Sequence, residues 1–175
     1  MTHSVPPTPA RQVVINGQPL DDEHLRALDA LSGTPILDGR YWYDHACGAW
    51  GMEGGPVLGF IVPGLDLPGP MPPDCSGGGT GTWINGRELH PQDRTALIQL
   101  FGACYPGRFW LDAQGNLGPE GGPPLANVLL AARQAQAGSG GGLVSDAGGT
   151  VGVDGSGGIG FFSRNADGSF TSWTN

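Results

Sequence analysis

Pairs of carboxylates recur at the same spacing in two parts of the chain. Asp44 and Glu53 lie in GRYWYDHACGAWGMEGGPVL, and Asp112 and Glu120 lie in GRFWLDAQGNLGPEGGPPL. Paired acids can perform general acid–base catalysis or hold a metal ion. In a purely structural role, the Asp would cap a hairpin turn and the Glu would satisfy backbone donors in the Gly-Gly-Pro bend. We favour the structural role, because an enzyme seldom keeps both copies of its site.

A second possible chemistry lies between these acids, where His45 and Cys47 follow Asp44. A thiol nucleophile, an imidazole base and an orienting carboxylate form the set used by cysteine hydrolases. Neighbouring residues on one turn rarely reach that geometry, so we expect no catalysis here. The alternative is a small hydrolase using His45 and Cys47, and it requires a thiol that alkylates quickly near neutral pH.

Two aromatic residues could bind a ligand, because the second copy of the sequence replaces them with leucine. Tyr43 and Trp50 correspond to Leu111 and Leu117. Such rings can stack on sugars or on proline-rich peptides. The predicted binding residues are therefore the two aromatics and the four repeated acids: Tyr43, Trp50, Asp44, Glu53, Asp112 and Glu120.

Cofactor chemistry is not indicated by the remaining residues. The three cysteines, Cys47, Cys75 and Cys104, are odd in number and lack the CxxC spacing of zinc sites, so we expect no metal and no cofactor. Every basic residue is arginine, which is typical of a GC-rich bacterial genome. A chain without lysine has neither a Schiff-base lysine nor a phosphate-loop lysine.

The elements that would position these residues also recur, about 68 residues apart. Each copy begins with a short β-branched segment and an Asn-Gly turn, at Asn16 and Asn85. A leucine-spaced helix follows and ends at Gly33 or Gly102. The stripes comprise Leu25, Leu28 and Leu31 in the first copy and Leu97, Leu100 and Phe101 in the second.

Aromatic strands come next, at Arg40–Asp44 and Arg108–Asp112. We expect the arginine at the start of each strand to pair with Glu53 or Glu120 across the hairpin. Residues 57–62 then form a strand or short turn in the first copy, whereas Leu125–Ala137 form a helix in the second.

The predicted fold class is α+β, with two tandem β-α-β-β repeats packed about a pseudo-twofold axis into one core. One such unit buries too little surface to be stable alone. The expected organisation is a flexible arm at 1–11, repeat one at 12–62, a Pro/Gly linker or strap at 63–80, repeat two at 81–137, and a glycine-rich β-hairpin tail at 138–175.

The composition narrows the range of partners. The formal net charge is −8, and no basic stripe is present, so nucleic acid is not an expected partner. The N-terminus lacks the pattern of a Sec signal peptide, and no apolar run approaches the ~18 residues of a membrane span. The tail segment GGTVGVDGSGG resembles one turn of the calcium repeat of secreted β-rolls, so both a cytoplasmic location and export without a signal peptide stay open.

Together these features predict a non-catalytic binding or assembly module with a protein partner. Self-association through the tail is the specific version, because short β segments with free edges recruit further strands. The alternatives are the Cys/His hydrolase and an exported glycan-binding effector that uses Tyr43 and Trp50.

Overall fold

The computed structural model describes residues 10–138, 163–164 and 170–171. They form a mixed α+β structure that includes two five-stranded sheets and three helices, so the predicted fold class is confirmed at this level. Within this part of the chain, no helix is long and apolar enough to cross a membrane.

The first sheet has the strand order β2-β1-β3-β4-β5. The central pair β1 and β3 is parallel, and the other neighbours are antiparallel. Helix α1 connects β2 to β3. Asp21 caps its start, and Gly33, with φ 71°, ends it where the sequence predicts. The bounds are β1 Val13–Ile15, β2 Gln18–Pro19, α1 Asp22–Ser32, β3 Gly39–Tyr43, β4 Ala49–Met52 and β5 Val57–Phe60.

The second sheet has the order β10-β9-β8-β6-β7, and its parallel pair is β6 and β8. Helix α2 connects β7 to β8 and begins with Pro91, whose missing N–H costs nothing in the first turn. The third helix follows β10 directly. The bounds are β6 Thr82–Ile84, β7 Arg87–Glu88, α2 Pro91–Phe101, β8 Gly107–Leu111, β9 Asn116–Pro119, β10 Ala126–Asn127 and α3 Val128–Gly138.

The predicted apolar stripes are buried at three of their six positions, and Leu31 and Leu100 are only partly buried. Leu25 and Leu28 of α1 are buried, and so is Leu97 of α2. Phe101 was expected in the stripe of α2 but is 37% exposed. Ala96 is buried in its place, because it lies one residue before Leu97 on the face that meets the core.

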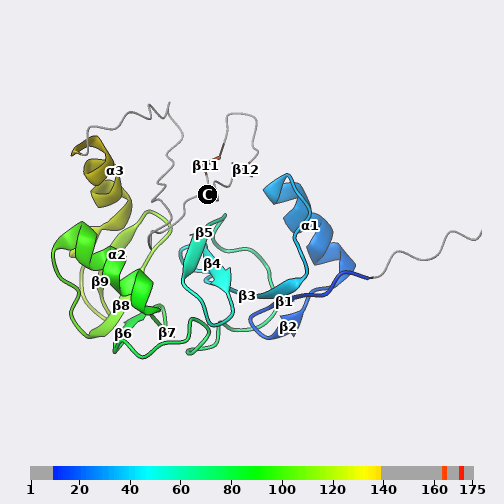
Figure 1. The fold of residues 1–175 in the computed structure, drawn as a ribbon, viewed down its shortest axis with the longest axis horizontal. Helices are drawn as coiled ribbons and strands as arrows, with labels where there is room; N and C mark the ends of the chain where they lie inside the picture. Colours follow the sequence, from blue (N-terminus) through cyan, green and yellow to red (C-terminus); the bar gives the residue numbers. More distant parts are fainter. Residues whose placement is uncertain (1–9, 139–162, 165–169, 172–175) are drawn as a thin grey trace, which may run out of the picture.

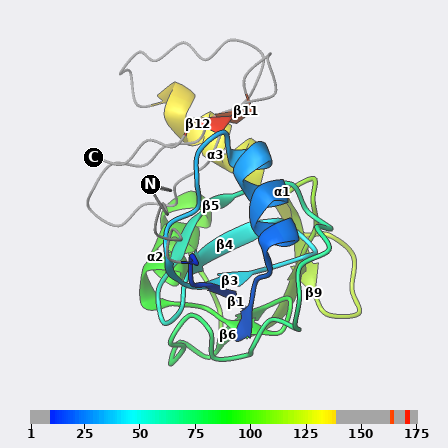
Figure 2. The same cartoon turned by 90° about the vertical axis from the view of Figure 1, so that its right-hand side faces the viewer.

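The buried side chains form two clusters, not the single core that we expected. The cluster under α1 belongs to the first sheet and the following loop, and includes Val13, Leu25 and Tyr43. The other cluster combines the opposite face of the first sheet with α2, α3 and the second sheet. The first sheet is therefore covered on both faces, by α1 on one side and by residues of the second half of the molecule on the other (Figures 1 and 2).

Residues 63–80, the predicted linker, lie against both sheets. Leu67 and Cys75 are buried, one in each cluster. The Cys75 carbonyl accepts a hydrogen bond from the Gly54 N–H, and the Pro73 carbonyl accepts one from Glu88. Of the two forms considered from the sequence, these contacts favour a packed strap.

In the tail, strand β11 (Ser163–Arg164) pairs antiparallel with β12 (Phe170–Thr171). The other segments of the expected glycine-rich hairpins, including 150–153, lie outside the described residues. Residues 1–9 of the predicted arm do so as well, whereas Arg11 is described and pairs with Asp29.

Candidate functional site

The repeated asparagines hold the two parallel strands of each sheet together. Asn16 follows β1, and its side chain accepts a hydrogen bond from the Tyr43 N–H and donates one to the Tyr43 carbonyl. Asn85 makes the same two bonds to Leu111 in the second sheet. Both asparagines adopt the left-handed conformation, with φ of 50° and 52°, which Asn tolerates better than most residues. The two sheets therefore share an asparagine at this position because it joins their parallel strands.

The repeated tryptophan, glycine and Glu-Gly-Gly-Pro segment form one structural unit. The Trp42 indole N–H donates to the Gly55 carbonyl at 3.2 Å, and Trp110 donates to Gly122 at 3.1 Å. A Cβ on Gly51 would lie 2.7 Å from the Trp42 ring and would collide with the carbonyl of Pro56. The glycine is required because the ring lies directly against the next strand.

The repeated aspartates cap hairpin turns, as the structural role predicts. Asp44 accepts the Ala46 N–H, and Asp112 accepts the N–H groups of Gln114 and Asn116. Although burial opposes the shift, hydrogen bonds from Asn116 lower the pKa of Asp112. Asp44 is 3% exposed and also accepts from Asn85 of the second half, so it serves the junction as well as its own turn.

The repeated glutamates bind the arginines across the hairpin. Arg40 Nε donates to Glu53 at 2.7 Å, while Arg108 and Glu120 lie 4.0 Å apart. The expected pairing of these residues is thus confirmed. The side chains of Glu53 and Glu120 are 46% and 49% exposed, and the ion pair, rather than a bond to the bend, is the contact that the structure shows.

The two aromatic candidates are part of the first sheet's packing. Tyr43 is 1% exposed, and its hydroxyl donates to the Val62 carbonyl and accepts from the Leu65 N–H. Trp50 packs against the same cluster, with its ring centroid 6.1 Å from that of Tyr41. Tyr43 therefore fastens the chain that follows β5, and its ring does not face solvent.

Cys47 and His45 are not arranged as a nucleophile and its base. The Cys47 thiol is buried and donates to Asp44 at 3.2 Å, and burial raises its pKa far above the usual range. His45 lies edge-on to Tyr43 and within 3.3 Å of the Leu67 carbonyl. Burial also raises the pKa of Cys75, to about 11. Within the described residues, no group of three or more His, Cys, Asp or Glu side chains could hold a metal ion.

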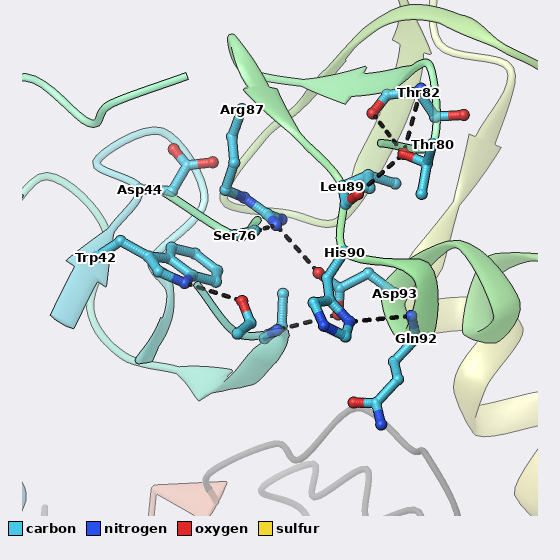
Figure 3. A network of polar contacts seen from close by, with 12 residues as sticks. Trp42, Asp44, Ser76, Thr80, Thr82, Arg87, Leu89, His90, Gln92 and Asp93 are labelled. Carbon is cyan, nitrogen blue, oxygen red and sulfur yellow. Dashed lines mark hydrogen bonds and ion pairs between the residues drawn. The ribbon is translucent and has the colours of Figure 1, made fainter. Parts of the chain in front are cut away.

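A buried polar network joins the two halves of the molecule (Figure 3). The Arg87 guanidinium stacks on the Trp42 ring at 4.2 Å from its centroid, and donates to the Asp93 carboxylate at 3.0 Å and to Ser76 at 2.7 Å. Asp93 accepts a further bond from the Val57 N–H of β5. All of these groups are buried, so the second half is docked on the Trp42 side of the first sheet through an ion pair shielded from water.

Sequence reasoning missed Arg87, Asp93 and Ser76, because none of the three is a residue that both copies share. In the first half, Gln18 and His24 stand where the second half has Arg87 and Asp93. The only available signal was this difference between matched positions, where a glutamine and a histidine in the first half correspond to an arginine and an aspartate in the second.

The halves meet through unlike surfaces. The first half offers the Trp42 face of its sheet, and the second offers the turn and helix start that carry Arg87 and Asp93. An isologous interface would pair equal surfaces, so this contact differs from the pseudo-twofold packing that we expected.

The second sheet carries the matching face on the side away from α2 and α3. We call it the Trp110 face; its residues are Trp83, Arg108, Trp110 and Glu120. Strand alternation places Phe109 and Leu111 towards the helices and Arg108 and Trp110 away from them. Trp110 is partly exposed, whereas Trp42 is 0% exposed. Arg108 lies over the ring of Trp83, 4.9 Å from its centroid.

The chain is similar to part of two curated plant proteins. It is 39% identical over 117 residues to extra-large guanine nucleotide-binding protein 1 of Arabidopsis thaliana, and 31% identical over 125 residues to protein 2 of the same name. The matches cover 65% and 69% of this chain but only 13% and 14% of the plant proteins. No family model and no solved structure matches the chain.

Proposed function

We propose that this chain is a non-catalytic protein-binding or assembly module built from a duplicated α+β unit. The proposal rests on the structural roles of the repeated residues. Each identity described above caps a turn, joins strands, holds a bend or forms an ion pair across a hairpin. The repeated residues thus build the frame, and we assign binding to the sheet face that is covered in the first half and open in the second.

The extent of the similarity supports a module. The matched region is a small part of each plant protein, as expected for a unit that occurs within larger chains. We propose that it plays an accessory role in those proteins as well. We also propose that the two halves are tandem copies of one unit. We further propose that the glycine-rich tail forms a β-hairpin that adds strands to a partner.

Guanine nucleotide binding, which the names of the plant proteins state, is not proposed for this chain. A phosphate-loop nucleotide site uses the lysine of GxxxxGK[ST] to cradle the phosphates, and this chain has no lysine. A fluorescent GTP analogue at micromolar concentration is expected to show no saturable binding. Saturable binding would show that the accessory role is wrong.

Sedimentation analysis tests assembly directly. We expect the full chain to form oligomers and a variant ending at residue 138 to sediment as a monomer with unchanged circular dichroism. Oligomers that persist in the truncated variant would remove the tail from the proposal. A full chain that is monomeric at all concentrations would remove self-association.

The hydrolase alternative depends on the reactivity of Cys47. A catalytic cysteine is kept as thiolate, but this thiol is buried and its pKa is raised. With iodoacetamide at pH 8, we expect the partly exposed Cys104 to be labelled well before Cys47 and Cys75, as read by peptide mass spectrometry. Fastest labelling at Cys47 would restore the hydrolase as the leading function.

A further inference from the structure

We propose that the Trp110 face binds an arginine-bearing segment of a partner protein. In this complex the partner's guanidinium stacks on the Trp110 indole and pairs with the Glu120 carboxylate. The inference rests on the proposed binding function and names the chemistry of its partner.

The molecule contains the template for this contact. Trp42 occupies the same place in the first sheet, with the same indole bond to the bend and the same glycine beneath the ring. There the ring is covered by a guanidinium on a tight turn, Arg87, which a carboxylate holds in place. Arginine is suited to this use because its planar cation both stacks on rings and forms directional bonds to carboxylates.

Glu120 is less firmly paired than its counterpart. Glu53 receives a hydrogen bond from Arg40 at 2.7 Å, but Arg108 stays 4.0 Å from Glu120 and stacks on Trp83 instead. Arg108 and Trp110 lie two residues apart on one face of β8, and Glu120 pairs with the backbone of Arg108. Diagonal neighbours in a sheet are within reach of long side chains. One incoming guanidinium can therefore contact both the ring and the carboxylate.

The charge of the chain favours the same occupant. With a formal net charge of −8, the protein attracts cationic partners over a distance. Glu120 adds a local carboxylate beside the ring, with 49% of its side chain exposed.

A second copy of this chain docked in the same way would lack the required cation. The docking surface of the second half carries Arg87 and Asp93. The equivalent surface of the first half carries Gln18 and His24 instead. A neutral amide does not reproduce a guanidinium stacked on a ring. The occupant we infer is thus a different protein that presents an arginine.

The test uses the isotope-labelled full chain and the indole N–H signals of its tryptophans. The probe is Nα-acetyl-arginine N-methylamide, and the matched control is its citrulline analogue, which has nearly the same shape without the charge. We expect the arginine probe to shift the Trp110 signal and to leave Trp42 unchanged, because Arg87 already covers that ring. Equal shifts with citrulline, or no shift at Trp110, would overturn the inference.

Two matched variants locate the carboxylate. Glu120→Gln is expected to weaken binding of the arginine probe about five-fold, the size of one exposed ion pair. Glu53→Gln, the equivalent change in the first half, is expected to leave it unchanged. Equal effects of the two variants contradict the assignment. Probe binding that fails while the tail-dependent oligomers persist defeats only this inference, whereas loss of both defeats the proposed function.

Discussion

Trp42 and Trp110 occupy the same place in their sheets but differ in what covers them. Both bind the Gly-Gly-Pro bend through the indole nitrogen and lie over a glycine of the next strand. Trp42 is sealed by the second half of the chain, and Trp110 is partly open. The shared residues therefore build two similar frames, and the unshared ones determine whether a face is filled from within the molecule or left for a partner.

The junction between the halves buries an ion pair, which is costly because both charges lose contact with water. Arg87 and Asp93 have side-chain exposures of only 3% and 5%, so each depends on the other for compensation. A buried pair is worth little relative to well-packed apolar residues, but breaking it leaves one uncompensated charge. The ion pair therefore fixes how the halves meet more than it adds stability.

The largest expected effect is at this junction. Asp93→Ala leaves Arg87 buried without its carboxylate and is predicted to cost about 3–5 kcal/mol of unfolding free energy in urea. His24→Ala, at the matched position of the first half, is predicted to cost far less. Similar losses for the two variants would mean that the halves are not held by this pair.

The frame itself should respond equally in both sheets. Gly51→Ala and Gly118→Ala each place a Cβ within 2.8 Å of a tryptophan ring, so each is predicted to cost about 1–3 kcal/mol through overpacking. Urea denaturation measures both. If one sheet tolerates the change and the other does not, the two frames are not equivalent.

An ion pair found only in the first half gives it a distinct pH dependence. Two hydrogen bonds from Arg11 lower the pKa of Asp29, whose matched residue in the second half is Ile98. A carboxyl whose pKa is lowered by folding stabilises the fold above its ordinary pKa, and this contribution is lost as pH falls through the lowered value. The difference in Tm between wild type and Arg11→Ala is thus predicted to be constant near neutral pH and to shrink below about pH 4. A difference that persists in acid would assign Arg11 a packing role instead.

The smallest effects are expected at the repeated glutamates. Glu53→Gln and Glu120→Gln remove ion pairs whose side chains are about half exposed, so each is predicted to cost less than about 1 kcal/mol. Chemical denaturation of both variants beside wild type gives the comparison. A loss of unfolding free energy above about 2 kcal/mol in either variant would show that the glutamate forms a hydrogen bond to a buried group.

Local elements of the fold could be predicted because their signals are local. Gly33 marks the end of α1 by its capping chemistry, and Asn16-Gly17 marks a turn that requires positive φ at both residues. The Arg40–Glu53 pair also followed from the sequence, since both residues flank one hairpin.

The junction could not be predicted, since its contacts join residues far apart in the chain. Val57 and Asp93 are separated by 36 residues, and nothing in their types indicates that a backbone N–H of β5 meets a carboxylate of α2. The lack of an aromatic counterpart predicts a ligand-stacking role for Tyr43. Its hydroxyl instead binds the backbone of the chain that follows β5, a role that appears only when the fold is known.

Hydroxyl-radical footprinting of the full chain, read by peptide mass spectrometry, tests the difference between the two faces most directly. Trp42 and Trp110 have the same intrinsic reactivity and the same local frame, so their labelling rates report how much of each ring reaches solvent. We predict several-fold faster labelling of Trp110 than of Trp42. Equal rates, or faster labelling of Trp42, would contradict the account of one filled and one open face.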